Sequence, residues 1–95
     1  MAKTYYVYIM TDTSHHTLYT GITSNLRQRV WQHKSGQGGR FTSQYTSRYL
    51  VYYAEMDDVY SAIAEEKRIK GGSRAGKIAM IEQQNPNWID LSADW

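Results

Sequence analysis

Two segments near the start of the chain follow the two-residue period of β-strands. In residues 5–11, Tyr6 and Tyr8 fall on one face of the strand and mostly apolar side chains fall on the other. A second segment, residues 17–22, follows after a short polar turn. We therefore expect an antiparallel hairpin in which Tyr19 stands near Tyr8, with two phenols side by side at the start of a basic helix.

The rest of the chain predicts one more strand, three helices and a tail. A first helix begins at a cap among residues 23–25 and ends near Ser35, and a polar loop follows it to about Ser47. A third strand covers residues 49–56. A second helix begins at Asp57 or Asp58 and ends near Gly71–Gly72, and a third helix covers Ser73 to about Gln84. These elements predict one α+β domain over residues 1–95, in which a central three-stranded antiparallel sheet is flanked by helices in the order ββαβαα. We expect the tail, residues 85–95, to pack back onto it through Trp88, Leu91 and Trp95.

The core-facing stripe of the first helix contains two polar residues. Leu26, Arg29, Val30 and His33 follow the spacing of one helix face. A guanidinium and an imidazole against a sheet lose hydration unless they find partners, which indicates a role beyond packing. The alternative is that Arg29 and His33 lie at the edge of the stripe and reach into water.

The second helix carries an acid in the same kind of position. Glu66 lies in an otherwise apolar stripe, whereas the adjacent Glu65 is expected to point to solvent. A buried carboxylate is usually paired with a base or bound to a metal ion. Two explanations therefore stay open: an ion pair between Arg29 and Glu66, or a hard cation such as Mg²⁺ held by Glu66. The apolar members of the stripe are Val59, Ala62, Ile63 and Ile69.

The charges are distributed unevenly along the chain. The formal net charge is only +2, but no Asp or Glu occurs from Thr13 to Ala54. An acid-free stretch that alternates cations with aromatic side chains suits a nucleic-acid backbone and its bases. A moderately basic surface with no such role is an equal alternative on charge alone. The cations of the stretch are Arg27, Arg29, Lys34, Arg40 and Arg48, with three histidines beside them.

Composition excludes several classes of site and setting. The chain has no cysteine, so it offers no disulfide, thiol nucleophile or cysteine-based zinc site. No apolar run approaches the roughly 20 residues that span a membrane, and the start of the chain lacks a signal-peptide pattern. We expect a soluble protein of the cytoplasm that has no membrane partner.

The chain resembles the GIY-YIG nuclease family. The hallmark tripeptides correspond to Tyr6-Val7-Tyr8 and Tyr19-Thr20-Gly21, and Asn25 to Arg29 follow them at the family's spacing. The resemblance covers nearly the whole chain. It is closest to the small single-domain bacterial branch related to the N-terminal nuclease domain of the excision-repair endonuclease subunit.

That resemblance implies a reaction site and a substrate. The family's catalytic positions match Tyr8, Tyr19, Arg29 and His33, and its metal-binding glutamate matches Glu66. It implies hydrolysis of a DNA phosphodiester, assisted by one Mg²⁺ or Mn²⁺ ion. Structured or branched DNA is among the substrates it allows. A planar guanidinium suits phosphate oxygens, and a metal ion acts as a Lewis acid.

Two questions remain open within this interpretation. Either Tyr8 or Tyr19 is expected to accept the proton of the attacking water as a phenolate held by positive charge, with His33 orienting it or sharing the proton.

Gly21 is expected to permit close backbone approach where strand meets helix. The expected DNA-backbone contacts are Arg27, Lys34, Arg40 and Arg48. The alternative function is a nucleic-acid-binding or partner-docking module with little or no turnover.

Overall fold

The computed structural model describes residues 3–35 and 49–95, and its elements follow the expected order ββαβαα. They are β1 (Tyr5–Thr11), β2 (Leu18–Thr23), α1 (Leu26–Ser35), β3 (Tyr49–Met56), α3 (Val59–Lys70) and α4 (Arg74–Gln84). The strand and helix boundaries lie within one residue or so of those expected from the sequence. The loop predicted after Ser35 lies outside the described residues.

The three strands form an antiparallel sheet in the order β2-β1-β3. The register places Tyr8 between Gly21 of β2 and Tyr53 of β3. The pairing of β1 with β3 shifts between Ile9 and Met10, where β3 carries one extra residue. Because β1 is the central strand, the hydroxyl-bearing Tyr8 lies in the middle of the sheet, while β2 forms one free edge of it.

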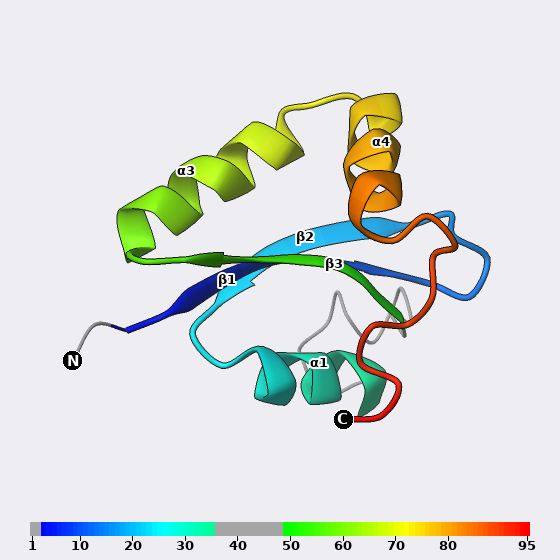
Figure 1. The fold of residues 1–95 in the computed structure, drawn as a ribbon, viewed down its shortest axis with the longest axis horizontal. Helices are drawn as coiled ribbons and strands as arrows, with labels where there is room; N and C mark the ends of the chain where they lie inside the picture. The colour runs from blue at the N-terminus through cyan, green and yellow to red at the C-terminus, as the bar shows by residue number, and fades with distance from the viewer. Residues whose placement is uncertain (1–2, 36–48) are drawn as a thin grey trace.

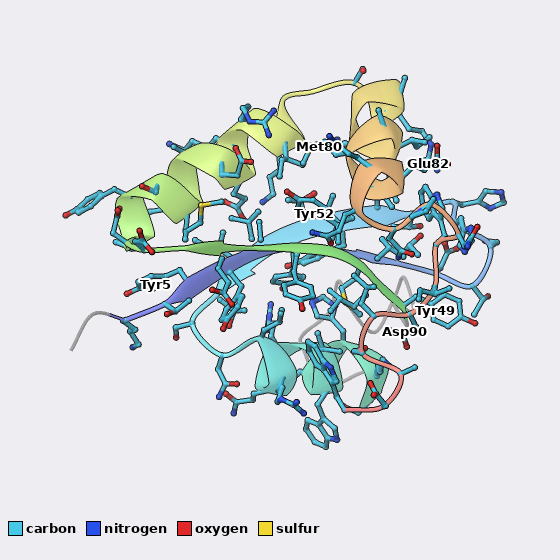
Figure 2. The ribbon with its side chains drawn as sticks, viewed as in Figure 1. Tyr5, Tyr49, Tyr52, Met80, Glu82 and Asp90 are labelled. Atoms are coloured by element: carbon cyan, nitrogen blue, oxygen red, sulfur yellow. The ribbon has the colours of Figure 1, made fainter. Side chains whose placement is uncertain are left out.

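Helices cover both faces of the sheet. α1 lies on one face, and α3 and α4 lie on the other (Figure 1). The alternation predicted for β1 is confirmed, because Val7 and Ile9 belong to the core under α3 and α4, whereas Tyr8 and Met10 belong to the core under α1. Figure 2 shows Tyr52 and Met80, which border the first core, between the sheet and the helices α3 and α4.

Side chains at the helix starts act as caps. Asp58 accepts a hydrogen bond from the Ser61 amide and Ser73 accepts one from the Gly76 amide, so both serve as N-caps. At α1 the side chain of Asn25 accepts from the Gln28 amide at 3.2 Å. Each cap satisfies an amide that would otherwise lack an intrahelical partner, which is why the helices begin where the polar residues stand.

The tail crosses from α4 to α1 around the β3 side of the sheet (Figure 1). Asn85 ends α4 and ties the tail down, because its amide group donates to the carbonyls of Val51 and Ile89 and accepts from the Ile89 amide. Leu91 packs against the core under α1. The Leu91 amide also donates to the carbonyl of Leu50 in β3 at 2.8 Å. No helix in the described ranges is long and apolar enough to cross a membrane.

Candidate active site

Four of the expected site residues meet under α1. The Tyr8 hydroxyl lies 3.1 Å from Nε2 of His33, and Nε of Arg29 donates to the same hydroxyl at 3.2 Å. Tyr19 completes the group, with its ring centroid 6.3 Å from that of Tyr8 and 4.8 Å from that of His33. β1, β2 and α1 therefore bring two phenols, a guanidinium and an imidazole into one cluster, which we call the Tyr8 cluster.

Gly21 makes room for this cluster. A Cβ atom at Gly21 would stand 2.6 Å from the Tyr8 hydroxyl oxygen and 2.8 Å from the ring carbon that bears it. Both distances are shorter than real carbon contacts, so any side chain would displace the phenol. Close approach at Gly21 was expected, but the group that approaches is the Tyr8 side chain rather than backbone.

The members of the cluster differ in their access to solvent. Tyr8 and His33 are fully buried, whereas Tyr19 and Arg29 are half-buried. A water molecule arriving from solvent therefore meets Tyr19 and Arg29 first. The core-facing stripe predicted for α1 is confirmed for Leu26, Val30 and His33, which are all buried.

Burial controls the protonation of Tyr8. Loss of hydration raises the pKa of Tyr8 to about 12, although the hydrogen bond and charge of Arg29 act in the opposite direction. Smaller contributions that raise the pKa come from the charges of Tyr19 and Glu66. Burial therefore opposes the expected phenolate at Tyr8, because desolvation outweighs Arg29. Tyr8 is a neutral phenol at physiological pH.

Burial also keeps His33 neutral. Desolvation, followed by the positive charge of Arg29, lowers the pKa of His33 to about 4. Its Nε2 can then accept the hydrogen of the Tyr8 hydroxyl, which itself accepts from Arg29. Within residues 3–35 and 49–95, Nδ1 of His33 is buried and has no hydrogen-bond partner. An unpaired polar atom in the interior is unfavourable, so packing alone does not account for the imidazole.

Within the part of the chain that the structure describes, Arg29 donates to Tyr8 and to Gln32. Besides its bond to Tyr8, its Nη1 donates to the side chain of Gln32 one turn along the helix at 3.1 Å. The bond to Tyr8 raises the pKa of Arg29 further above its usual value. Sequence reasoning missed Gln32, although its position three residues after Arg29 was a usable signal.

Glu66 does not join the Tyr8 cluster by direct contact. It lies on α3, the helix that covers the opposite face of the sheet (Figure 1), and its carboxylate is 3.2 Å from Nζ of Lys70. The alternative of an ion pair between Arg29 and Glu66 is wrong, because the ion pair that Glu66 forms among the described residues is with Lys70, and Arg29 donates to Tyr8 and Gln32. Glu66 nevertheless contributes to the raised pKa of Tyr8, so its charge acts on the cluster.

The two adjacent acids of α3 are more alike than expected. The side chain of Glu66 is 19% exposed and that of Glu65 is 23% exposed. Glu65 is bound by both Nε and Nη2 of Arg68. The expected contrast between a solvent-facing Glu65 and an inward-facing Glu66 is therefore absent, because the two side chains are similarly exposed.

The donor set suits a hard cation better than a transition metal. The described residues contain no cluster of three or more His, Asp or Glu side chains that could hold an ion. Mg²⁺ characteristically takes one or two carboxylates and fills its remaining positions with water and substrate phosphate. The pair of Glu66 with the exposed Lys70 is the kind of surface contact worth only about 0.3–0.5 kcal/mol, so it leaves this carboxylate available to an ion.

The described cations that are expected to bind DNA differ in their contacts. Lys34 is paired with Asp90 of the tail at 2.6 Å, a partner that sequence reasoning missed. Arg27 lies over the ring of Trp95, 5.0 Å from its centroid. The expected contacts Arg40 and Arg48 lie outside the described residues.

Comparison with known proteins assigns the chain to a family. The model of the GIY-YIG catalytic domain matches residues 4–79. A UPF0213 protein of Natronomonas pharaonis is 36% identical over 84 residues, which cover 88% of this chain and 98% of the relative. A UPF0213 protein of Syntrophus aciditrophicus is 39% identical over 82 residues, which cover 85% and 92%.

A solved structure shares the fold. The solution structure of a UPF0213 protein from Bacillus halodurans superimposes with a TM-score of 0.56 at 24% identity, over 90% of this chain and 89% of that one. The segment matched by the domain model contains Tyr8, Tyr19, Arg29, His33 and Glu66. The chain belongs to the GIY-YIG family, a nuclease superfamily, and within it to the UPF0213 proteins.

Proposed function

We propose that this protein is a divalent-metal-dependent endonuclease that hydrolyses phosphodiester bonds of DNA. The observation that carries the proposal is the convergence of Tyr8, Tyr19, Arg29 and His33 from three separate elements. Phe and Leu would pack better at these positions, so packing alone does not explain a group of hydroxyls beside a guanidinium. Membership of a nuclease superfamily supports the same conclusion.

Arg29 binds the phosphate in this proposal. Its hydrogen bonds to Tyr8 and Gln32 hold the guanidinium in one orientation, while its half-exposed position leaves it open to solvent. A fixed, always charged fork stabilises the negative charge that grows on the phosphate oxygens in the transition state. Lys at this position would supply the charge without the geometry.

Tyr19 is the better candidate for the residue that receives the proton of the attacking water. Tyr8 is fully buried and its pKa is raised to about 12, so it neither meets water nor ionises readily. Tyr19 is half-buried and lies against His33. In this assignment Tyr8 and His33 are positioning residues, which hold Arg29 and Tyr19 in register from inside the core.

Glu66 would hold the metal ion, with water and the substrate phosphate as the other ligands. When bound, a divalent ion supplies Lewis-acid stabilisation of the phosphate and the leaving oxygen. The β2 edge lies between α1 and α3, so the substrate would bind there, reached by Arg29 from one face of the sheet and by Glu66 from the other. Mg²⁺ is the first candidate ion, because Glu66 would be the only protein ligand in this proposal and Mg²⁺ is commonly bound by one or two carboxylates.

A nicking assay on plasmid and branched DNA tests the proposal. Arg29→Ala and Glu66→Gln are each expected to lower the metal-dependent cleavage rate about a hundredfold or more, the scale measured when one charge-stabilising group is removed from an active site. The matched control is Glu65→Gln, because Glu65 is adjacent, similarly exposed and also paired with a cation of its own helix.

Three results would contradict the proposal or part of it. Cleavage that persists unchanged in both site variants would come from a contaminating nuclease. A purified wild-type protein that binds DNA but never cleaves it with Mg²⁺ or Mn²⁺ would be the alternative, a binding module on a nuclease scaffold. Equal losses in Glu65→Gln and Glu66→Gln would remove the specific role of Glu66.

A further inference from the structure

Two tryptophans flank a groove between α1 and the tail. Trp31 is 57% exposed and Trp95 is 42% exposed, although tryptophan is usually well covered in folded proteins. Both line the same hollow of about 270 Å³. An open groove between two exposed indoles is a feature that the Tyr8 cluster does not explain. The other lining residues are Arg27, Val30, Lys34, Ser92 and Ala93.

The groove lies on the opposite flank of α1 from Arg29. Arg27, Trp31 and Lys34 follow one another at helical spacings of four and three residues, so they share one face. Arg29 and His33 fall on another face of the same helix, beside Tyr8. A chain that crosses α1 could therefore occupy the groove and the Tyr8 cluster at once.

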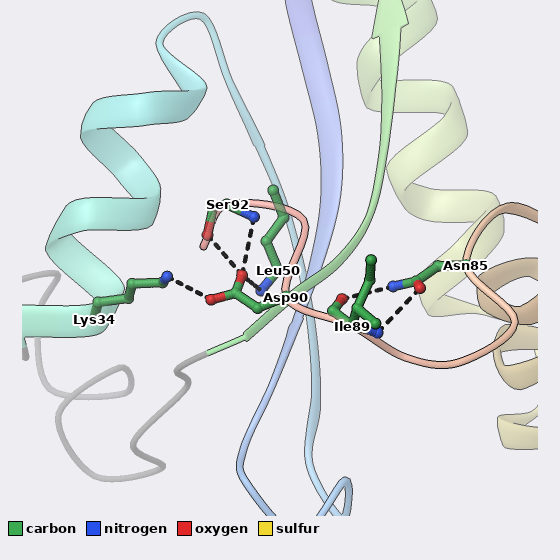
Figure 3. A network of polar contacts seen from close by, with 6 residues as sticks. All are labelled: Lys34, Leu50, Asn85, Ile89, Asp90 and Ser92. Atoms are coloured by element: carbon green, nitrogen blue, oxygen red, sulfur yellow. Dashed lines mark hydrogen bonds and ion pairs between the residues drawn. The ribbon is translucent and has the colours of Figure 1, made fainter. Parts of the chain in front are cut away.

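The wall formed by the tail is well anchored. Asp90 accepts hydrogen bonds from the Leu50 amide at 3.1 Å and from the Ser92 amide at 3.0 Å, and it pairs with Lys34 (Figure 3). The ring of Trp95 contacts both Arg27 and Tyr53. The ring centroids of Trp95 and Tyr53 are 6.2 Å apart. The groove is thus formed before any ligand arrives.

The chemistry of the lining favours an anion with a flat, aromatic part. Among the described residues, no acidic side chain lines the groove, and the two charged residues that do are cations. The charge of Lys34 is shared with Asp90, so attraction for an anion rests mainly on Arg27. The neighbouring hollow, about 280 Å³ in volume, contains Glu55 and suits an anion less well.

We propose that the groove between Trp31 and Trp95 binds an unpaired nucleotide of a nucleic acid, with its base against Trp31 and its phosphate toward Arg27. Exposed indoles stack on bases of any identity, and the neighbouring cations contact the backbone. A paired base inside a duplex offers no free face for such stacking. This inference rests on the proposed nuclease function, since it specifies substrates that contain an unpaired segment near the cleaved bond.

Binding without turnover tests the groove separately from cleavage. The probes are a labelled oligothymidylate of about ten nucleotides and an abasic oligomer of the same length, measured by fluorescence anisotropy in EDTA. Trp31→Ala is expected to weaken oligothymidylate binding about tenfold, as the loss of one stacked base does. It should leave binding of the abasic oligomer unchanged, and Trp31→Phe should restore most of the affinity.

Tyr60→Ala is the matched control, because Tyr60 is an aromatic residue 81% exposed on α3, across the sheet from the groove. It should bind oligothymidylate as the wild type does. Trp95→Ala alters the opposite wall and serves if Trp31→Ala fails to fold, as judged by circular dichroism. With this substitution too, a selective loss for the oligothymidylate is expected.

Several results would overturn the inference. Equal affinities of the wild type, Trp31→Ala and Trp95→Ala would show that the indoles take no part. A Trp31→Ala loss that is the same for the abasic oligomer would reflect charge or folding rather than stacking. Failure of the wild type to bind oligothymidylate would remove the ligand altogether. None of these results touches the cleavage assay of Arg29→Ala and Glu66→Gln, so the two proposals can fail separately.

Discussion

At Tyr8, burial and charge oppose each other at a single atom. Arg29 donates to the hydroxyl and favours its ionisation, yet desolvation raises the pKa to about 12. The sequence predicts that Arg29, on the helix after the hairpin, can approach the phenol. It does not show how deeply Tyr8 is buried, because that depends on how α1 packs. The same packing buries His33 and leaves Tyr19 half-exposed, so two similar phenols acquire different roles.

His33 should make the stability of the protein depend on pH. Its pKa falls from 6.5 to about 4 on folding, so the unfolded chain binds the proton more readily between these values. The contribution is therefore complete above about pH 6.5 and is lost as the pH falls toward 4. At 1.36 kcal/mol for each pKa unit it amounts to about 3 kcal/mol.

Urea unfolding from pH 7 to pH 4 measures this effect when the wild type is compared with His33→Gln. We expect the wild type to lose more free energy of unfolding than the variant over that range, by about the amount above. The comparison cancels the carboxylates, which titrate in both proteins. Parallel curves for the two proteins would mean that His33 is already accessible to protons in the folded state.

At the scale of elements, the sequence predicted the strands and helices well. Alternation in β1 identified both faces, and Asp58 and Ser73 marked the starts of α3 and α4. The periodicity of a helix shows which of its sides faces the sheet, but it does not show which face of the sheet the helix covers. Because β1 buries side chains on both faces, nothing in the pattern placed α1 and α3 on opposite sides.

The attachment of α1 depends on a tail segment that is distant in sequence. Asp90 joins Lys34 of α1 to the Leu50 amide of β3 and to Ser92 (Figure 3). Burial alone would raise the pKa of Asp90, but hydrogen bonds from Lys34, Ser92 and Leu50 lower it instead. Sequence reasoning placed the tail against the domain and left Asp90 without a role, because its partners lie 40 and 56 residues away along the chain.

Replacement of Asp90 should loosen this junction in two steps. Asp90→Ala leaves the buried Leu50 amide without its acceptor and is expected to lower the free energy of unfolding by about 2–3 kcal/mol. Asp90→Asn keeps an acceptor oxygen and loses mainly the partly exposed ion pair, so about 1 kcal/mol or less is expected. Asp94→Ala, at an exposed position nearby, is the control. Chemical denaturation distinguishes them, and equal stabilities of the Asp90→Ala and Asp94→Ala proteins would refute this account of the tail.

At the scale of the whole molecule, the proposed chemistry requires two faces of the sheet to act together. α1 supplies Arg29 to one face, and α3 supplies Glu66 from the other. The proposal requires the two to meet at the edge strand β2, where Gly21 leaves room for the Tyr8 phenol. Convergence of four of these residues followed from the hairpin and one helix stripe, whereas the placement of Glu66 needed the three-dimensional structure.

A crystal soaked with Mn²⁺ and examined by anomalous diffraction tests this shared site most directly. The account predicts a single strong peak within coordination distance of the Glu66 carboxylate, on the side facing Tyr19 and Arg29, and its loss in Glu66→Gln crystals. Release of Glu66 from Lys70 should accompany it. A peak bound elsewhere, such as at Asp90, or a Glu66 carboxylate that stays bare at saturating Mn²⁺, would contradict the claim that helices on opposite faces serve one reaction.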